Sequence, residues 1–305
     1  MDVTERRRSI ERAEGVHDPR SGVRRVGAAL ARTNLRPRKS RGQNFLVQEG
    51  VAQRIVEALQ VAAGDQVIEV GPGLGILALN AARRPLSRLT LVEIDGRLAA
   101  ELRQVFHQDA RVTVLNADFL ELDLAPIADG GSLKVVGNLP FNVATAILER
   151  LSGQHRLIQR MVLMFQREVA ERIRAQPGMR NHCALSVLTA LDWRITEHFR
   201  VAAGSFYPRP TVDAEVLVFE PHPDRPFGAE EETLLRRTIH AGFSAPRRTI
   251  RNCLVGGLMI APEAAAAAIA AARIEPSMRP AMLNVAEFVR LARALREQGV
   301  FDRDA

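Results

Sequence analysis

The chain has 305 residues, 47% of them hydrophobic and 25% charged, which is enough for one large or two ordinary globular domains. The net charge of +7 lies in residues 1–41, where twelve Arg or Lys outnumber five Asp or Glu, so the remaining chain is neutral overall. No apolar run reaches the roughly 18 residues of a membrane helix, and no secretory-type leader is present. The cysteines and histidines show no metal-ligand spacing. We therefore expect a cytoplasmic protein with neither a membrane partner nor a metal ion.

Residues 1–33 lack periodicity, and we expect a flexible basic extension. Such an extension suits a polyanionic partner, although a solvated tail without a partner is the alternative. From residue 51 on, helical patterns alternate with short apolar strands, which is typical of an α/β fold with a mostly parallel sheet. Strands are predicted at 66–70, 89–92, 112–115, 133–136, 157–165, 194–199 and 215–219, and helices at 51–62, 76–82, 97–106, 143–151 and 166–175.

The proline-rich stretch 221–226 is a candidate domain boundary. Beyond it every pattern is helical, including the alanine-rich run 262–273. The sequence therefore predicts an α/β domain at 34–222 and a small all-helical domain at 227–305.

A glycine-rich turn follows the first strand of the alternation, with Gly71, Gly73 and Gly75 ahead of a helix. Glycines in such a turn let a ligand approach the backbone at a helix N-terminus. Glu93, at the end of the next strand, is placed to hold ribose hydroxyls. The pattern predicts a nucleoside cofactor and is shared by dinucleotide enzymes and S-adenosylmethionine (SAM) methyltransferases. The alternative is a tight turn with a surface Glu.

Two further strand ends carry polar residues. Asp118 ends the third strand and can accept from an adenine amino group, or serve only as a helix N-cap. The fourth strand leads into Asn138, Leu139, Pro140 and Phe141. Here the amide can accept from an amine, Pro stiffens the backbone and Phe offers a stacking face. Ligands of open α/β sheets bind at the carboxyl ends of the strands, so we expect this turn beside the reactive end of the cofactor.

Several motifs occur in order along the chain: RGQNFL at 41–46, EVGPGLG at 69–75, NLPFN at 138–142, QREVAER at 166–172, FYPRPTVD at 206–213, FSAPRRTIRN at 243–252 and LNVAEF at 283–288. Together they resemble the rRNA adenine N6-dimethyltransferase family over about 36–295, and within it the branch that modifies the small ribosomal subunit. The resemblance implies a Rossmann-like SAM-dependent methyltransferase sheet with a small C-terminal all-helical domain. Phe141 stands where this family usually has Tyr.

The resemblance also implies roles for single residues. Asn44 and Leu46 match a backbone clamp on S-adenosyl-L-methionine, and Gly71, Glu93 and Asp118 match further cofactor contacts. Asn138 matches the residue that contacts both the cofactor and the target amine, while Phe206 matches an aromatic near the target base. The implied reaction adds two methyl groups to each of two adjacent adenosines in the 3′-terminal hairpin loop of 16S rRNA, as a step of small-subunit biogenesis. We expect a monomer.

An exocyclic amine is a poor nucleophile because its lone pair is conjugated into the ring. We expect Asn138 Oδ1 and the Leu139 carbonyl to accept its two N–H bonds and favour an attacking geometry, which requires positioning more than a base. Phe141 can stack on the adenine. An unpaired loop base is extruded at small cost, in keeping with such a target.

The segment 233–262 holds five arginines and no acid, and we expect Arg247, Arg248 and Arg251 to bind RNA phosphates. A looser group at 156, 160, 167, 172 and 174 is a second candidate. The alternative for both is a helix surface with unpaired charge.

Three other functions stay open at this stage. An Erm-type enzyme would act on large-subunit (23S) rRNA, a non-catalytic assembly factor would only bind immature subunits, and a dehydrogenase would bind NAD. The segment 243–252 favours the small-subunit enzyme over the first, and the intact turn at 138–141 argues against the second.

Overall fold

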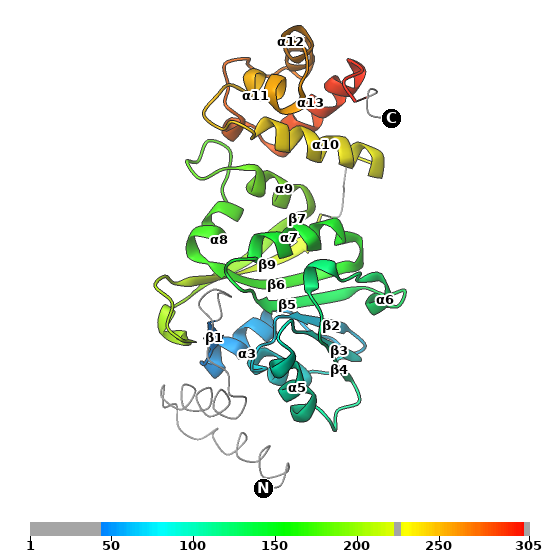
Figure 1. The fold of residues 1–305 in the computed structure, drawn as a ribbon, viewed down its shortest axis with the longest axis vertical. Helices are drawn as coiled ribbons and strands as arrows, with labels where there is room; N and C mark the ends of the chain where they lie inside the picture. The colour runs from blue at the N-terminus through cyan, green and yellow to red at the C-terminus, as the bar shows by residue number, and fades with distance from the viewer. Residues whose placement is uncertain (1–43, 223–226, 302–305) are drawn as a thin grey trace. The chain divides into compact units, whose positions relative to one another are not determined.

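The computed structural model describes residues 44–222 and 227–301 (Figure 1). These form two compact units: 44–143 with 162–164 and 200–214, and 144–161 with 165–199, 215–222 and 227–301. The basic extension 1–33 and the first part of the 41–46 motif lie outside the described residues. In the described part, no helix has both the length and the apolar character needed to cross a membrane.

The first unit is built on parallel strands. Its elements are β1 (Phe45–Leu46), α3 (Glu49–Ala58), β2 (Gln66–Val70), α4 (Ile76–Ala82), β3 (Arg88–Val92), α5 (Gly96–Val105), β4 (Val112–Leu115), α6 (Ala125–Ala128), β5 (Leu133–Asn138) and β8 (Phe206–Tyr207). Strand β2 pairs in parallel with both β3 and β5, and β3 pairs with β4. Val67, Ile68 and Val70 are buried, as expected of parallel strands covered on both faces.

Strand and helix positions in this unit follow the sequence closely. The predicted strands 66–70 and 112–115 and the predicted helix 76–82 are observed at those residues. The first helix ends at Ala58 rather than near 62, because Leu59 caps it and Gln60 has a φ of +53°, outside the helical region. Seven of the described strands form one sheet in the order β4-β3-β2-β5-β6-β9-β7, which confirms the predicted Rossmann-like α/β class.

A two-stranded ribbon was not predicted. Strand β1 pairs with β8 antiparallel, with Phe45 opposite Tyr207 and Leu46 opposite Phe206. Strands of two residues carry no periodicity that a sequence could reveal. The ribbon brings together two motifs that are far apart in the chain.

The second unit contains the C-terminal helices, which are seen together in Figure 1. Its helices are α7 (Ala144–Gly153), α8 (Arg167–Ile173), α9 (Ala184–Asp192), α10 (Ala229–Gly242), α11 (Ile250–Leu258), α12 (Pro262–Ala271) and α13 (Val285–Glu297). It also holds most of β6 (Ile158–Gln166), β7 (Trp193–Val201) and β9 (Ala214–Pro221), of which 162–164, 200–201 and 214 are counted with the first unit. Val187 and Leu191 of α9 share one hydrophobic core with Ile239 and Phe288. The C-terminal helices therefore pack on α9, and the boundary expected after residue 222 stays a prediction.

Candidate active site

The polar strand ends singled out in the sequence all belong to the first unit. Strands β2, β3 and β4 run in register, with Val70 opposite Val92 and Val92 opposite Leu115. Their carboxyl ends therefore meet at one edge, where ligands of such sheets bind. The residues that follow these ends make the contacts described below.

The glycine turn lies between an aromatic ring and a proline. Gly71 and Gly73 have φ values of +64° and +58°, which side chains rarely adopt. A Cβ on Gly73 would lie 3.1 Å from the Phe45 ring, and one on Gly71 would lie 3.7 Å from Cδ of Pro140. The turn thus contacts both the 41–46 motif and the 138–142 motif.

Glu93 is folded back onto the glycine turn. Its Oε2 accepts from Gly73 N at 3.0 Å, and its Oε1 accepts from Asp95 N at 2.9 Å. Burial raises the pKa of this carboxyl above its ordinary value, and the two N–H bonds oppose that shift. The bond to Gly73 joins the ends of β2 and β3, so the predicted ribose-binding acid and the turn form one structure.

Glu69 is a second buried acid that the sequence analysis did not single out. Its side chain is 1% exposed, and Oε2 has no hydrogen-bond partner among the described residues. Burial, with a further contribution from the Glu93 charge, raises its pKa to about 8. This carboxyl lies two residues before Gly71 and is a further candidate for the site. The sequence could not single it out, because its burial is a property of the fold.

The third strand end is tied to the second by Asn116, which the sequence analysis also missed. Asn116 Nδ2 donates to the Glu93 carbonyl at 2.8 Å and to the Ile94 carbonyl at 3.3 Å. Asp118 Oδ1 accepts from Leu120 N at 2.9 Å and caps a short 3-10 turn. Asp118 therefore acts as an N-cap, and it uses only one carboxylate oxygen, Oδ1, to do so.

The amide of Asn138 is oriented by the N-terminal motif. Asn138 Nδ2 donates to the Asn44 carbonyl at 2.9 Å. That bond assigns the nitrogen to Asn44 and makes Oδ1 the atom that can accept from an amine. The turn is closed by Val143 N, which donates to the Pro140 carbonyl at 3.1 Å. The half-buried Phe141 follows the fully buried Leu139.

The remaining predicted contacts lie on the ribbon. Leu46 is 3% exposed and pairs through its backbone with Phe206, which is also 3% exposed. The neighbouring Tyr207 is 37% exposed. The structure thus brings the predicted cofactor clamp against the predicted target-base aromatic, and Phe206 lies within the wall of the site rather than on the open surface.

The residues at these strand ends fit a SAM-like cofactor. The glycine turn presents backbone at positive φ, Glu93 and Asp118 offer acceptors for hydroxyl and amino groups, and Glu69 adds an orphaned buried acceptor. Glu69 and Glu93 have no ion-pair partner among the described residues, and the raised pKa of Glu69 keeps that carboxyl protonated below about pH 8.

The predicted RNA-binding arginines belong to the second unit. Arg247 and Arg248 are exposed before α11, while Arg251 is half-buried and its Nε has no partner among the described residues. Arg236, counted in the same acid-free segment, instead pairs with Asp192 and Glu232. In the looser group, three arginines are likewise ion-paired: Arg160 with Glu220, Arg167 with Glu171 and Arg174 with Glu215.

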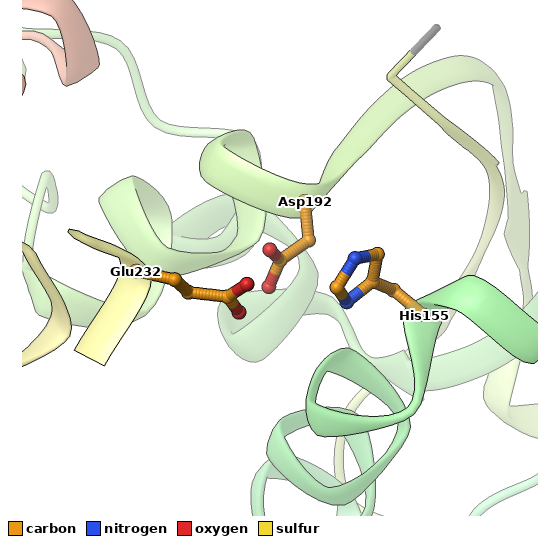
Figure 2. Close-up of side chains that lie close together, drawn as sticks. All are labelled: His155, Asp192 and Glu232. Carbon is orange, nitrogen blue, oxygen red and sulfur yellow. The ribbon is translucent and has the colours of Figure 1, made fainter. Parts of the chain in front are cut away.

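A second polar cluster joins residues that no sequence motif connects. His155, Asp192 and Glu232 place ligand-type atoms within 4.8 Å of one another (Figure 2). Such a group has the composition of a metal site, but Arg236 NH2 lies 2.6 Å from Asp192 Oδ2 and 2.9 Å from Glu232 Oε1. The guanidinium supplies the positive charge that a metal ion would bring, so this arrangement needs no metal.

Comparison with known proteins gives concordant results. The model of a family described as ribosomal RNA adenine dimethylase matches residues 34–297. The ribosomal RNA small subunit methyltransferase A of Geobacter metallireducens is 39% identical over 87% of this chain and 98% of its own. The protein of the same name from Pseudomonas aeruginosa is 35% identical over 86% of this chain and 96% of its own.

Two solved structures have a similar fold. A dimethyladenosine transferase from Plasmodium falciparum has a TM-score of 0.69 and 20% identity, over 84% of this chain and 98% of its own. The 23S rRNA methyltransferase ErmE has a TM-score of 0.63 and 24% identity, over 83% of this chain and all of its own. At these identities the likeness concerns the fold alone.

Proposed function

The chain belongs to the ribosomal RNA adenine dimethylase family, a group of SAM-dependent methyltransferases, and on this premise we propose that it dimethylates N6 of two adjacent adenosines in the 3′-terminal hairpin loop of 16S rRNA. The substrate class follows the names of relatives that match nearly their whole length. A role in small-subunit biogenesis in the cytoplasm, with the enzyme as a monomer, goes with this substrate.

Cofactor binding is assigned to the first unit. Asn44, just before β1, and Leu46 in β1 would hold the cofactor, as would Gly71 through its backbone and Glu93 and Asp118 through their carboxylates. When bound, SAM supplies an electrophilic methyl group on a positively charged sulfur.

The turn 138–141 is assigned to the target adenine. Asn138 Oδ1 and the Leu139 carbonyl accept the two N–H bonds of N6, which draws the lone pair out of conjugation with the ring. Phe141 stacks on the base, and Pro140 keeps the turn against Gly71 and therefore against the cofactor. Catalysis in this arrangement comes from positioning rather than from a strong base.

The observation that carries the proposal is the bond from Asn138 Nδ2 to the Asn44 carbonyl. An Asn138 side chain with only a structural role could point either amide atom at the site. Here the donor atom is engaged, so the acceptor atom is the one presented, and an amino group is the ligand that an acceptor selects. Arg247, Arg248 and Arg251 are proposed to bind the phosphates of the same RNA.

The test is methyl transfer from tritiated SAM to purified ribosomal subunits that lack the modification. We expect label in small subunits, at two adjacent adenosines located by primer extension, with two methyls each. Label in large-subunit rRNA would identify an Erm-type activity instead. Binding to small subunits without transfer would identify a non-catalytic assembly factor, and calorimetric binding of NAD without SAM would indicate a dehydrogenase.

A further inference from the structure

The ribbon of β1 and β8 is held by more than its two paired residues. On the β1 side, Val47 N donates to the Ser205 carbonyl at 2.8 Å. Ser205 Oγ then donates to Gln48 Oε1 at 3.0 Å. Ser205 is 2% exposed, so Gln48 satisfies a hydroxyl that is otherwise out of reach of water. These contacts extend the pairing to 45–48 and 205–207.

Gln48 bonds to Ser205 and does not cap the helix α3 that follows it. It occupies the N-cap position of α3, where a side chain commonly accepts from the first turn of the helix, yet it makes no capping bond. Its side chain is exposed and turned toward a segment 157 residues further on. A local cap would contribute to the helix alone, whereas this bond joins two functional segments.

The other contacts of β1 reach the cofactor and amine sites. The Phe45 ring packs on the backbone of Gly73, whose N–H is held by Glu93. The Asn44 carbonyl fixes the amide of Asn138. One short strand therefore contacts the glycine turn, the catalytic amide and, through the ribbon, Phe206. A shift of β1 would therefore displace the glycine turn, the Asn138 amide and Phe206.

We propose that the Gln48–Ser205 bond couples cofactor binding to target-adenosine binding, with Gln48 and Ser205 as positioning residues that neither ligand touches. The proposal rests on the proposed function, because it presupposes that β1 contacts the cofactor and that β8 carries the residue beside the target base. The ribbon pairs β1 with β8, so a ligand that fixes the position of one strand also fixes the position of the other. By linkage, each ligand raises the affinity of the other by the same factor.

The test measures this factor with S-adenosylhomocysteine, which cannot react. Its dissociation constant is measured by equilibrium dialysis, with and without saturating undermethylated small subunits. For the wild-type protein we expect at least about fivefold tighter binding in the presence of subunits, the lower end of ordinary coupling. In Ser205→Ala and in Gln48→Ala we expect the factor to fall below about twofold, with the affinity for S-adenosylhomocysteine alone retained within about threefold.

Two controls separate coupling from folding. Ser87→Ala removes a hydroxyl that donates to the Gly64 and Asp65 carbonyls elsewhere in the same unit, and it should leave the factor at the wild-type value. Gln48 is exposed, so Gln48→Ala reports on the bond even where Ser205→Ala impairs folding. Both changes delete the same hydrogen bond, so the coupling factor of the double variant should equal that of either single variant.

The proposal is overturned if the wild-type factor is close to one, or if both variants keep the wild-type factor. Failure of the proposed function has a different signature, because the wild-type protein would then not methylate small subunits. A protein that methylates small subunits but shows an unchanged factor in the variants retains its function and loses only the coupling.

Discussion

Two pairs of acidic residues in this chain have opposite surroundings. Asp192 and Glu232 in the second unit share the guanidinium of Arg236, whose pKa the two carboxylates raise although burial opposes its charge. Glu69 and Glu93 in the first unit share no cation among the described residues, and burial raises the pKa of both. The first pair depends on a nearby cation, whereas buried carboxyls with a raised pKa and no cation beside them are typical of a binding site.

The largest expected effect on function comes from removing the catalytic acceptor, Asn138, in the first unit. In Asn138→Ala we expect kcat for methyl transfer to fall by about 10²–10³-fold, because the target amine loses its acceptor, while the fold remains. Single-turnover kinetics on small subunits measure this. Asn181→Ala removes an exposed amide that donates to the Glu171 carbonyl and serves as the matched control. Near-normal turnover in Asn138→Ala would rule out the assigned role.

Removing the cation of the second unit should affect stability and not chemistry. Arg236→Ala removes the guanidinium from the buried Asp192 and the partly buried Glu232, and we expect a loss of about 3 kcal/mol in the free energy of unfolding measured with urea. The exposed pair of Arg293 and Glu231 provides the control, since Arg293→Ala should cost no more than about 1 kcal/mol. Equal losses in the two variants would show that Asp192 and Glu232 do not depend on Arg236.

Glu69 predicts a pH dependence whose sign follows from its raised pKa. The folded protein holds this proton up to about pH 8, whereas the unfolded chain releases it near the ordinary value of 4.5. Stability should therefore fall as pH rises from 4.5 to 8, by about 1.4 kcal/mol per pH unit at most. Glu69→Gln keeps the shape without the charge and should abolish this part of the slope.

Urea denaturation of both proteins at several pH values measures the difference. Glu121→Gln, at an exposed acid of the same unit, should leave the wild-type slope unchanged. A Glu69→Gln protein that loses stability with pH as steeply as the wild type would show that Glu69 is already ionised in the fold, and would weaken the contrast between the two acidic groups.

The smallest effect is expected at Phe141. Phe141→Tyr adds a hydroxyl and retains the stacking face, so we expect the rate to change by no more than about twofold and the ratio of dimethyl to monomethyl adenosine to stay the same. Mass spectrometry of the modified rRNA fragment measures both. A shift toward monomethyl product in either protein would show that the hydroxyl controls how far methylation proceeds.

Most of the α/β order was readable in the sequence. The alternation of apolar runs and helical patterns located β2, β4 and α4 residue for residue, because these elements follow from local periodicity. The polar residues at strand ends could be assigned to one edge for the same reason. The ribbon of β1 and β8 and the helix α9 were not predicted, since two residues carry no period and α9 is buried on nearly all sides.

The sequence by itself determined the fold class, the family and the residues Gly71, Glu93, Asp118 and Asn138 as a candidate set, since motif spacing and strand ends are local properties. Only the tertiary structure decided which atom of Asn138 faces the site, because its partner Asn44 lies 94 residues away. The same holds for Arg236, which sequence places in a basic RNA-binding segment and the fold pairs with Asp192. Hydrogen bonds and ion pairs between distant segments depend on packing, and packing has no local signature.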